Sequence, residues 1–134
     1  MPTSLLIRRA KAADVPVIHR LIVDASLHGK ILKRTPHDIR KNVRHFWVAE
    51  EKGRVQACCS LEVYSKKLAE IRSLAVYAAR RKRGIATALI EVCLREAKRR
   101  GIYEVLAITD REDLFKRRGF SEQLHGQKAL FLRP

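Results

Sequence analysis

The stretch AEIRSLAVYAARRKRGIATALIEVCLREAKRRG, residues 69–101, changes its hydrophobic pattern in the middle and thereby decides the fold. The short apolar run over residues 69–77 predicts a β-strand. From Gly84 onward, apolar residues recur at positions i, i+3, i+4, i+7 and i+8, which predicts an α-helix with one buried face. These residues are Ile85, Ala88, Leu89, Val92, Cys93 and Ala97. A strand, a basic turn and an amphipathic helix therefore follow one another.

Further signals support this helix. Glu91–Arg95 and Glu96–Arg100 have the i,i+4 spacing and the favourable order for ion pairs along a helix face. Gly101 follows the last periodic residue and is expected to act as the C-cap.

The remaining elements predict a mixed α/β (α+β) domain. Strands are expected over residues 4–9, 46–50, 54–64 and 103–109, and over two final segments, GF (119–120) and KALFLR (128–133). The strands 46–50 and 54–64 flank the turn EKG (51–53) and are expected to form an antiparallel hairpin, with alternating apolar residues along the second strand. Helices are expected after Asp14, after the capping-box-like segment 35–38, and over residues 112–118. The order β-α-α-β-β-β-α-β-α-β-β describes a twisted sheet flanked by helices, and no linker or repeat divides it, so residues 1–134 form one domain.

The charge balance is unusual. The chain has 29 basic and 14 acidic residues, a formal net charge of +15, which favours anionic partners without identifying them. The three cysteines, Cys58, Cys59 and Cys93, lack C-x-x-C spacing and are expected to be small buried residues in a reducing compartment. No stretch reaches the roughly 18 apolar residues of a membrane helix, so a cytoplasmic protein is expected. The five histidines are scattered, and no metal site is expected.

The strand–turn–helix stretch has the outline of a phosphate site. Free N–H groups and the positive end of the helix dipole favour an anion at a helix N-terminus. Here the turn adds four consecutive basic residues, 80–83. It contains neither the G-x-x-x-x-G-K pattern of a Walker A loop nor the G-x-G-x-x-G pattern of a dinucleotide turn.

The spacing R-x-x-G-x-A over residues 81–86 resembles the pyrophosphate-binding loop of the GCN5-related N-acetyltransferase (GNAT) superfamily. The first strand and helix and the segment FKRRGF (115–120) extend this resemblance over essentially the whole chain. Within the superfamily, GKILKRTPHDIRKNVRHFWVAE (29–50) and AEIRSLAV (69–76) are most similar to the short N-acetylglutamate synthase-like amino-acid N-acetyltransferases. Two departures are Lys82, where a second glycine is frequent, and YAA (77–79) in place of Asp-Pro.

The resemblance implies that acetyl-CoA is the co-substrate and indicates which residues bind it. Backbone groups of the fourth strand are expected to pair with the pantetheine and the carbonyl, and the loop and helix start are expected to hold the pyrophosphate. Phe115 stands where many acetyltransferases have a proton-donating Tyr, and it is expected to pack against the cofactor or the core. The complete set is Leu74, Ala75, Val76, Arg81, Lys82, Arg83, Gly84, Ile85, Ala86, Thr87 and Phe115.

Candidate catalytic and substrate residues also follow from matched positions. Glu70 matches the glutamate associated with deprotonating the amine, and Thr109 matches a Ser/Thr that could donate to the leaving thiolate. For the acceptor's carboxylate, Arg34 is the best candidate and Lys33 and Arg72 are weaker ones. The alternative for Arg72 is an ion pair on the strand face that it shares with Glu70.

The leading hypothesis is an acetyl-CoA-dependent N-acetyltransferase that moves the acetyl group directly, in a ternary complex, to the amine of a small amino acid such as glutamate. Alternatives are acetylation of a protein or peptide amine, a non-catalytic CoA-binding domain, and a basic nucleic-acid-binding module. Nucleic-acid contacts are expected to be nonspecific because no recognition motif is present. The sequence leaves the oligomeric state open, a homodimer included.

Overall fold

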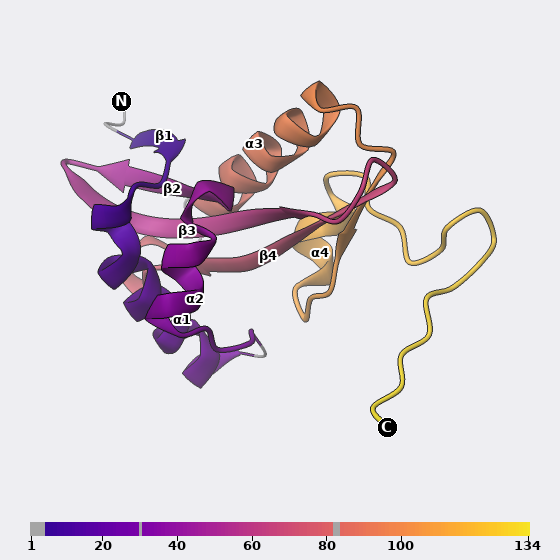
Figure 1. Ribbon diagram of the computed structural model, residues 1–134, viewed down its shortest axis with the longest axis horizontal. Coiled ribbons are helices and arrows are strands. Elements are labelled where there is room, and N and C mark those ends of the chain that lie inside the picture. Colours follow the sequence, from indigo (N-terminus) through magenta and orange to yellow (C-terminus); the bar gives the residue numbers. More distant parts are fainter. Residues whose placement is uncertain (1–4, 30, 82–83) are drawn as a thin grey trace.

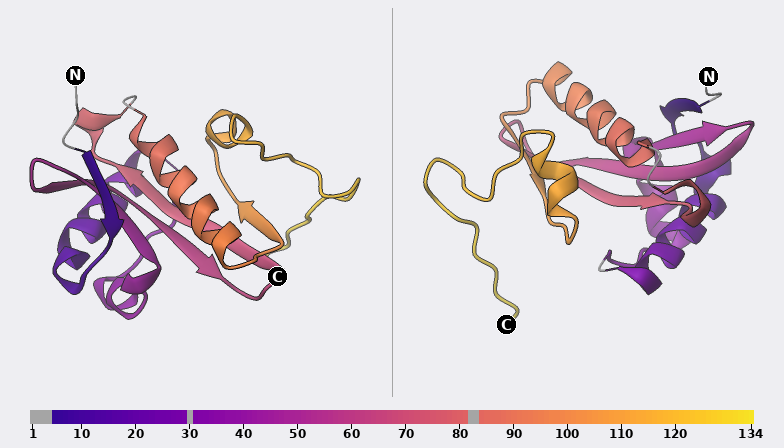
Figure 2. Two further views of the ribbon diagram at one scale, coloured as in Figure 1. Left: turned by 90° about the horizontal axis from the view of Figure 1, so that it is seen from above. Right: turned by 180° about the vertical axis from the view of Figure 1, so that it is seen from behind.

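A computed structural model describes residues 5–29, 31–81 and 84–134 of the chain. Ser4, Lys82 and Arg83 therefore lie outside the described residues, and so do the expectations that rest on them. The described part forms one layered α/β unit, with a central sheet between helices (Figures 1 and 2). This architecture confirms the predicted fold class.

The sheet has five strands in the order β1-β2-β3-β4-β5. They are β1 (Leu5–Arg9), β2 (Phe46–Glu51), β3 (Arg54–Val63), β4 (Leu68–Val76) and β5 (Glu104–Ala107). Neighbours are antiparallel except β4 and β5, which run parallel because α3 connects them as a crossover. The hairpin of β2 and β3 turns at Lys52 and Gly53, which both have positive φ (53° and 77°), as a two-residue hairpin turn of the primed type requires.

Helices cover both faces of the sheet (Figure 2). On one face lie α1 (Val15–His28) and α2 (Pro36–Lys41), and on the other lie α3 (Ile85–Arg99) and α4 (Glu112–Lys116). Short 3₁₀ turns occur at Ala12–Asp14, Val43–His45 and Ala78–Arg80. The predicted start of α2 is confirmed, because the Thr35 side chain accepts a hydrogen bond from the Asp38 N–H at 3.0 Å.

Two apolar clusters hold these layers together. Ile18, Ile22, Ile39 and Phe46 belong to the α1/α2 side, and Leu89, Ile90 and Cys93 belong to the α3 side, all fully buried. In β3 every residue from Gln56 to Leu61 is buried, although the sequence predicted alternation. The reason is that helices cover both faces at this strand, so neither set of side chains reaches solvent.

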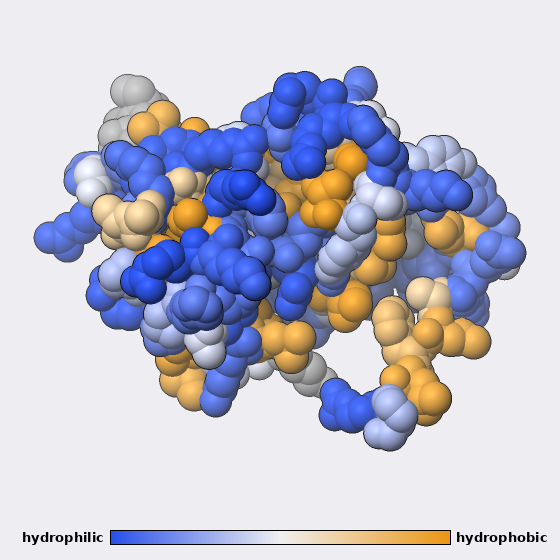
Figure 3. All heavy atoms as spheres, viewed as in Figure 1, coloured by the Kyte–Doolittle hydropathy of each residue, from blue (hydrophilic) through white to orange (hydrophobic). Residues whose placement is uncertain are grey.

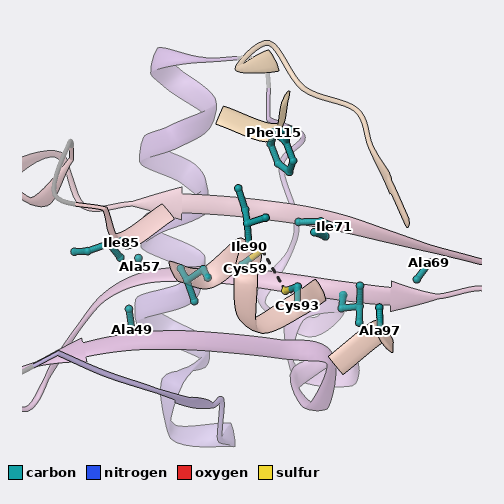
Figure 4. Close-up of a cluster of buried hydrophobic side chains, with 12 residues drawn as sticks. Ala49, Ala57, Cys59, Ala69, Ile71, Ile85, Ile90, Cys93, Ala97 and Phe115 are labelled. Atoms are coloured by element: carbon teal, nitrogen blue, oxygen red, sulfur yellow. Dashed lines mark hydrogen bonds between the residues drawn. The ribbon is translucent and has the colours of Figure 1, made fainter. Parts of the chain in front are cut away.

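The three cysteines are buried, as predicted. Cys93 of α3 and Cys59 of β3 face each other across the helix–sheet interface, with their sulfur atoms 3.8 Å apart (Figure 4). Burial raises the pKa of the Cys58 thiol to about 12, and the contact with the Cys93 thiol together with burial raises the pKa of the Cys59 thiol. These thiols act as packing groups and not as nucleophiles.

The two predicted ion pairs along α3 are wrong in their partners. Glu96 receives hydrogen bonds from Arg99, one turn along the helix, and from Arg9 of β1, and it is almost fully buried. Glu91 pairs with Arg118, beyond α4. Arg9 and Arg118 lie outside α3, so residue spacing within the helix could not indicate these partners. The C-cap is Arg100, one residue before the predicted Gly101, and Gly101 follows it with a φ of +70° and donates to the Lys98 carbonyl.

The two final strands do not form. After α4 the described chain makes one isolated bridge, between Leu124 and Gln127, and residues 128–133 run through solvent without a strand partner. Figure 1 shows this segment leading away from the sheet to the C-terminus. Residues 128–133 have a strand-like composition, but they form no strand because no other strand of the described chain pairs with their main chain.

Candidate active site

The sheet opens between β4 and β5. These strands pair only over Leu68–Ile71 and Glu104–Ala107, whereas β4 continues to Val76. Beyond Ile71, no strand within the described residues pairs with the β5-facing edge of β4. Main-chain groups of Leu74 and Val76, predicted to bind the pantetheine, therefore lie in a part of β4 that an extended ligand can join.

A bulge in β4 marks the start of this opening. Cys58 pairs with Ala75 and Ser60 with Arg72, so Ser73 and Leu74 lie opposite the single residue Cys59. Ser73 has a φ of +56°, a strained value for a residue with a side chain. The extra residue shifts the alternation by one, so Leu74 and Val76 pack on the α3 side together with Ile71.

The start of α3 has the backbone geometry that an anion cradle requires. Its N-cap is Gly84, which has a φ of +77°, and Ala88 donates the first helical hydrogen bond, to the Gly84 carbonyl. No described side chain caps this end, so the N–H groups of Ile85, Ala86 and Thr87 remain available to a ligand. A Cβ at Gly84 would meet nothing within 4 Å, so the space above the cradle is open. The residues present therefore fit a phosphate group.

The described cations of the basic turn are already paired. Arg80 contacts Glu51 at 2.7 Å, whereas Arg81 contacts Asp24 of α1 at 3.4 Å and donates to the Val76 carbonyl. These contacts hold Arg80 and Arg81 against β2, α1 and the end of β4. The turn therefore has a structural role in addition to its positive charge.

Glu70 lies on the α1/α2 side of β4 and has one neighbour that the sequence did not indicate. The Tyr64 hydroxyl donates a hydrogen bond to Glu70 Oε1 at 2.5 Å. Partial burial and this contact with the carboxylate raise the pKa of Tyr64 to about 12, so the phenol keeps its proton at neutral pH. Glu62 lies directly opposite Glu70 on β3, which brings two carboxylates onto one patch of the sheet.

Arg34 neutralises part of this acidic patch. Its guanidinium contacts Asp38 at 2.6 Å and Glu62 at 3.4 Å, donates to the Ser73 hydroxyl at 3.2 Å, and lies over the Phe46 ring. The hydrogen bond from Arg34 is the main cause of the lowered pKa of Asp38. Only 4% of the Arg34 side chain is exposed, so the cation lies behind the surface of the site.

The other predicted carboxylate-binding cations differ in exposure. Arg72 approaches Glu62 at 3.8 Å and exposes 32% of its side chain, so it is held loosely beside the acidic patch. This confirms that Arg72 and Glu70 share a face of β4. Lys33 is exposed and, within the described chain, makes no ion pair. Of the two arginines beside the acidic patch, Arg72 therefore has more room for a new partner than Arg34.

Thr109 and Phe115 lie beyond the end of β5. The strand ends at Ala107, two residues earlier than predicted, and the Thr109 hydroxyl accepts a hydrogen bond from the Arg111 N–H at 2.8 Å. Phe115 is buried in the α3-side cluster, edge-to-face with Phe120 at 5.3 Å between ring centroids. Phe115 therefore packs in the core, one of the two roles expected for it.

Sequence reasoning missed Tyr64, Ser73 and Glu62. Register could have indicated Glu62 and Tyr64, because β3 and β4 form a hairpin in which positions 62 and 70 pair and Tyr64 follows on the same face. No sequence signal marks the bulge, since a serine with positive φ has no distinctive neighbours.

Comparison with known proteins places this chain in a family. The acetyltransferase (GNAT) family model matches residues 28–126. An uncharacterized N-acetyltransferase from Chlorobaculum tepidum is 39% identical over 116 residues, 87% of this chain and 75% of that protein. An amino-acid acetyltransferase from Mycobacterium tuberculosis is 34% identical over 120 residues, 87% of this chain and 68% of that protein.

Solved structures show the same fold with ligands. A Mycobacterium tuberculosis protein in complex with CoA and NLQ has a TM-score of 0.84 and 33% identity, over 89% of this chain and 73% of that one. N-acetylglutamate synthase from Neisseria gonorrhoeae, complexed with CoA and N-acetyl-glutamate, has a TM-score of 0.84 and 25% identity. That match covers 90% of this chain but only 29% of the synthase chain.

The described residues contain neither a metal-holding cluster nor a membrane-spanning helix. No group of three His, Cys, Asp or Glu side chains in this part of the chain is arranged to hold a metal ion. None of its helices is long and apolar enough to span a membrane.

Proposed function

Because the chain belongs to the acetyltransferase (GNAT) family, we propose that this acetyl-CoA-dependent N-acetyltransferase acts on the amine of a small amino acid, with glutamate as the first candidate. Transfer is direct, within a ternary complex of protein, acetyl-CoA and acceptor. The observation that carries the proposal is the position of Glu70. It lies on β4, the strand whose free edge begins two residues later, at Arg72, and whose end leads into the cradle at Gly84.

The co-substrate supplies a thioester-activated acetyl group. Its pyrophosphate is bound by the N–H groups at the start of α3, and Arg81, Lys82 and Arg83 add positive charge. Its extended arm pairs with the main chain of Leu74, Ala75 and Val76. A main-chain N–H of this segment also stabilises the negative charge that develops on the carbonyl oxygen.

Glu70 takes the proton of the acceptor's ammonium group, through a water molecule, which leaves a neutral amine. The amine nitrogen then forms a bond to the acetyl carbon while the carbon–sulfur bond breaks. The sulfur leaves as a thiolate, and the nitrogen gives its second proton to solvent water. The Tyr64 hydroxyl fixes one oxygen of Glu70 and leaves the other for the water. Tyr64 is therefore a positioning residue and Glu70 the catalytic base.

Arg72 binds the acceptor's carboxylate, supported by Lys33 at the surface and Arg34 behind it. Arg72 has the exposure and the loose contact with Glu62 that an exchange of partners needs. Arg34 is already paired with carboxylates of this chain, and its role is to hold Ser73 and Glu62 in place. The bound N-acetyl-glutamate of the Neisseria gonorrhoeae synthase supports an acceptor of this chemistry.

Thr109 is the candidate for stabilising the leaving thiolate. Its oxygen accepts a hydrogen bond from the backbone, and its own hydrogen is donated to no residue of the described chain. A hydrogen bond from this neutral hydroxyl stabilises the leaving thiolate, so the reaction does not need a tyrosine at position 115. Water then protonates the thiolate.

The test is CoA release from acetyl-CoA over a panel of amino acids and short peptides, followed with a thiol reagent. The buried cysteines of the chain give little background. Glutamate is expected to be the best acceptor. Glu70→Gln is expected to lower kcat by about 100-fold or more, as loss of a general base does, and to leave binding of CoA unchanged.

Matched variants separate recognition from chemistry. Arg72→Gln is expected to raise KM for glutamate at least tenfold with a smaller effect on kcat, and Arg20→Gln, an exposed cation on α1, is the control. Full activity of Glu70→Gln would overturn the base assignment. If the peptides were acetylated and the free amino acids were not, the assignment of a small amino acid as the acceptor would be wrong.

A further inference from the structure

A basic hollow lies at the C-terminal end of α3, and its volume is about 440 Å³. Its walls come from the end of β1, from the 3₁₀ turn Val43–His45 and from the end of α3. The lining residues are Arg9, Arg44, His45, Glu96, Arg99 and Arg100. Hydrophilic side chains cover this end of α3 in Figure 3. The volume is within the range of pockets that hold small ligands.

The hollow contains more positive than negative charge, because four guanidinium groups and one carboxylate line it. The carboxylate is that of Glu96, and both of its oxygens are already used. Oε2 accepts hydrogen bonds from Arg9 at 2.9 Å and from Arg99 at 2.8 Å, and Oε1 accepts one from Arg99 at 3.1 Å. Arg44 and Arg100 make no ion pair with an acidic side chain of the described chain. An excess of three positive charges therefore remains in this one place.

The helix accounts for only part of this clustering. Cations in a last helical turn interact favourably with the helix dipole, which explains Arg99, and Lys66 Nζ also donates to the Arg100 carbonyl at 3.3 Å. Arg9 and Arg44 come from other elements, and Arg9 Nη1 donates to the Arg44 main-chain carbonyl at 3.0 Å. Because like charges repel, cations that three separate elements bring to one hollow lower the stability of the fold unless an anion binds among them.

Two buried polar atoms of the same segment have unused hydrogen-bonding capacity. His45 Nδ1 and Trp47 Nε1 are buried and make no hydrogen bond within the described residues. Buried polar atoms nearly always have a partner, so each exception calls for an explanation. His45 itself lines the hollow, and the Arg9 guanidinium lies over the Trp47 ring, 4.3 Å from its centroid. The start of β2 therefore adds an unpaired imidazole nitrogen to the cations of the hollow.

We propose that this hollow binds a small oligophosphate, a short chain of linked phosphate groups, either free or as part of a nucleotide. A guanidinium fork can donate two parallel hydrogen bonds to the oxygens of one phosphate, and a linked chain places several negative charges among several forks. Arg44 and Arg100 bind the phosphates, while Arg9 and Arg99 remain on Glu96 and add positive charge. The phosphates and not a base are recognised, because Arg9 already covers the Trp47 ring.

This site is separate from the CoA cradle. The cradle lies at the first turn of α3 and the hollow at its end, and the 15 residues of the helix span roughly 22 Å. CoA and an oligophosphate are therefore expected to bind to one chain together. The inference goes beyond the proposed function, since it needs neither the catalytic base nor a particular acceptor.

The test is a calorimetric titration of inorganic triphosphate into the full chain saturated with CoA, in about 0.15 M salt, which screens charges beyond about 8 Å. Saturable binding is expected, and Arg44→Gln/Arg100→Gln is expected to weaken it at least tenfold. The control is Arg20→Gln/Arg54→Gln, which removes the same charge at exposed positions of α1 and β3 and is expected to leave binding unchanged. Absence of saturable binding, or equal weakening by both pairs, would overturn the proposal.

Trp47 gives a second readout, because it is the only tryptophan of the chain and contacts Arg9. Triphosphate is expected to change its fluorescence in the parent and not in Arg44→Gln/Arg100→Gln. ATP with an affinity within about threefold of triphosphate would support recognition of the phosphates alone, and ATP that binds at least tenfold tighter would identify a nucleotide as the source. Citrate as tight as triphosphate would overturn the phosphate class. A short RNA that binds at least tenfold tighter than triphosphate would overturn the small ligand.

Discussion

Tyr64 donates a hydrogen bond to Glu70 across the β3–β4 hairpin, at 2.5 Å, and thereby fixes the carboxylate at the centre of the candidate site. The two residues are six apart in the sequence: Tyr64 directly follows the end of β3, and Glu70 lies on β4, the antiparallel neighbour of β3. The relationship explains how an acidic side chain on a partly exposed strand keeps one orientation. It also assigns the tyrosine a role that a search for a proton donor near position 115 would not find.

Replacing this tyrosine tests the relationship. Tyr64→Phe keeps the ring and removes the donor, so Glu70 loses its fixed orientation. We expect kcat to fall about tenfold, the usual cost of one hydrogen bond to a charged group, with KM for acetyl-CoA unchanged. Tyr103→Phe, at an exposed tyrosine before β5, is the control. An unchanged kcat for Tyr64→Phe would remove Tyr64 from the mechanism.

The bulge at Ser73 can be tested by a pair of substitutions. Ser73→Gly removes the hydroxyl that accepts from Arg34 but adopts the positive φ without strain. Ser73→Val also removes the hydroxyl and places a β-branched side chain at that φ. We expect Ser73→Val to lower the free energy of unfolding by about 1–3 kcal/mol more than Ser73→Gly, measured by urea denaturation. Equal losses would show that backbone strain is not significant here.

Two glycines at opposite ends of α3 separate binding from stability. Gly84 and Gly101 both have positive φ, and a Cβ at either one meets nothing within 4 Å. Alanine at each position therefore costs a similar strain, about 1 kcal/mol. We expect only Gly84→Ala to weaken CoA binding, by tenfold or more in calorimetry, and Gly84→Val to abolish it. A similar loss for Gly101→Ala would indicate an effect transmitted through helix stability.

The buried Glu96 predicts acid sensitivity. Hydrogen bonds from Arg99 and Arg9 lower the pKa of Glu96 to about 2. For a carboxyl group with a lowered pKa, the stabilisation is complete above the ordinary value near 4.5 and is lost as pH falls toward 2. In the parent protein we expect the free energy of unfolding to fall by about 1–3 kcal/mol over this pH range because of Glu96. In Glu96→Gln this fall is expected to be absent.

The control for this measurement is Glu91→Gln, which removes a more exposed ion pair with Arg118. Its unfolding free energy is expected to keep the parent's slope between pH 4.5 and 2. A Glu96→Gln variant with that same slope would assign the acid sensitivity to other carboxylates, of which Asp14 and Asp38 also have lowered pKa values.

The sequence by itself determined the features that depend on neighbours along the chain. The 3.6-residue period and Gly101 defined α3, the alternation and turn defined the β2–β3 hairpin, and the spacing around Gly84 indicated the phosphate cradle. These signals are local because helix faces, caps and turns are set by a few consecutive residues. The family followed from the same residues.

Only the tertiary structure decided which remote groups meet. Glu96 accepts a hydrogen bond from Arg9 and not from Arg100, and Tyr64 donates one to Glu70. The bulge at Ser73 places the Leu74 side chain on the α3 side of the sheet. Residues 128–133 have the composition of a strand but do not form one, because a strand needs the main chain of a neighbouring strand to pair with. Ion pairs, register and strand edges depend on distances between segments that the order of residues does not contain.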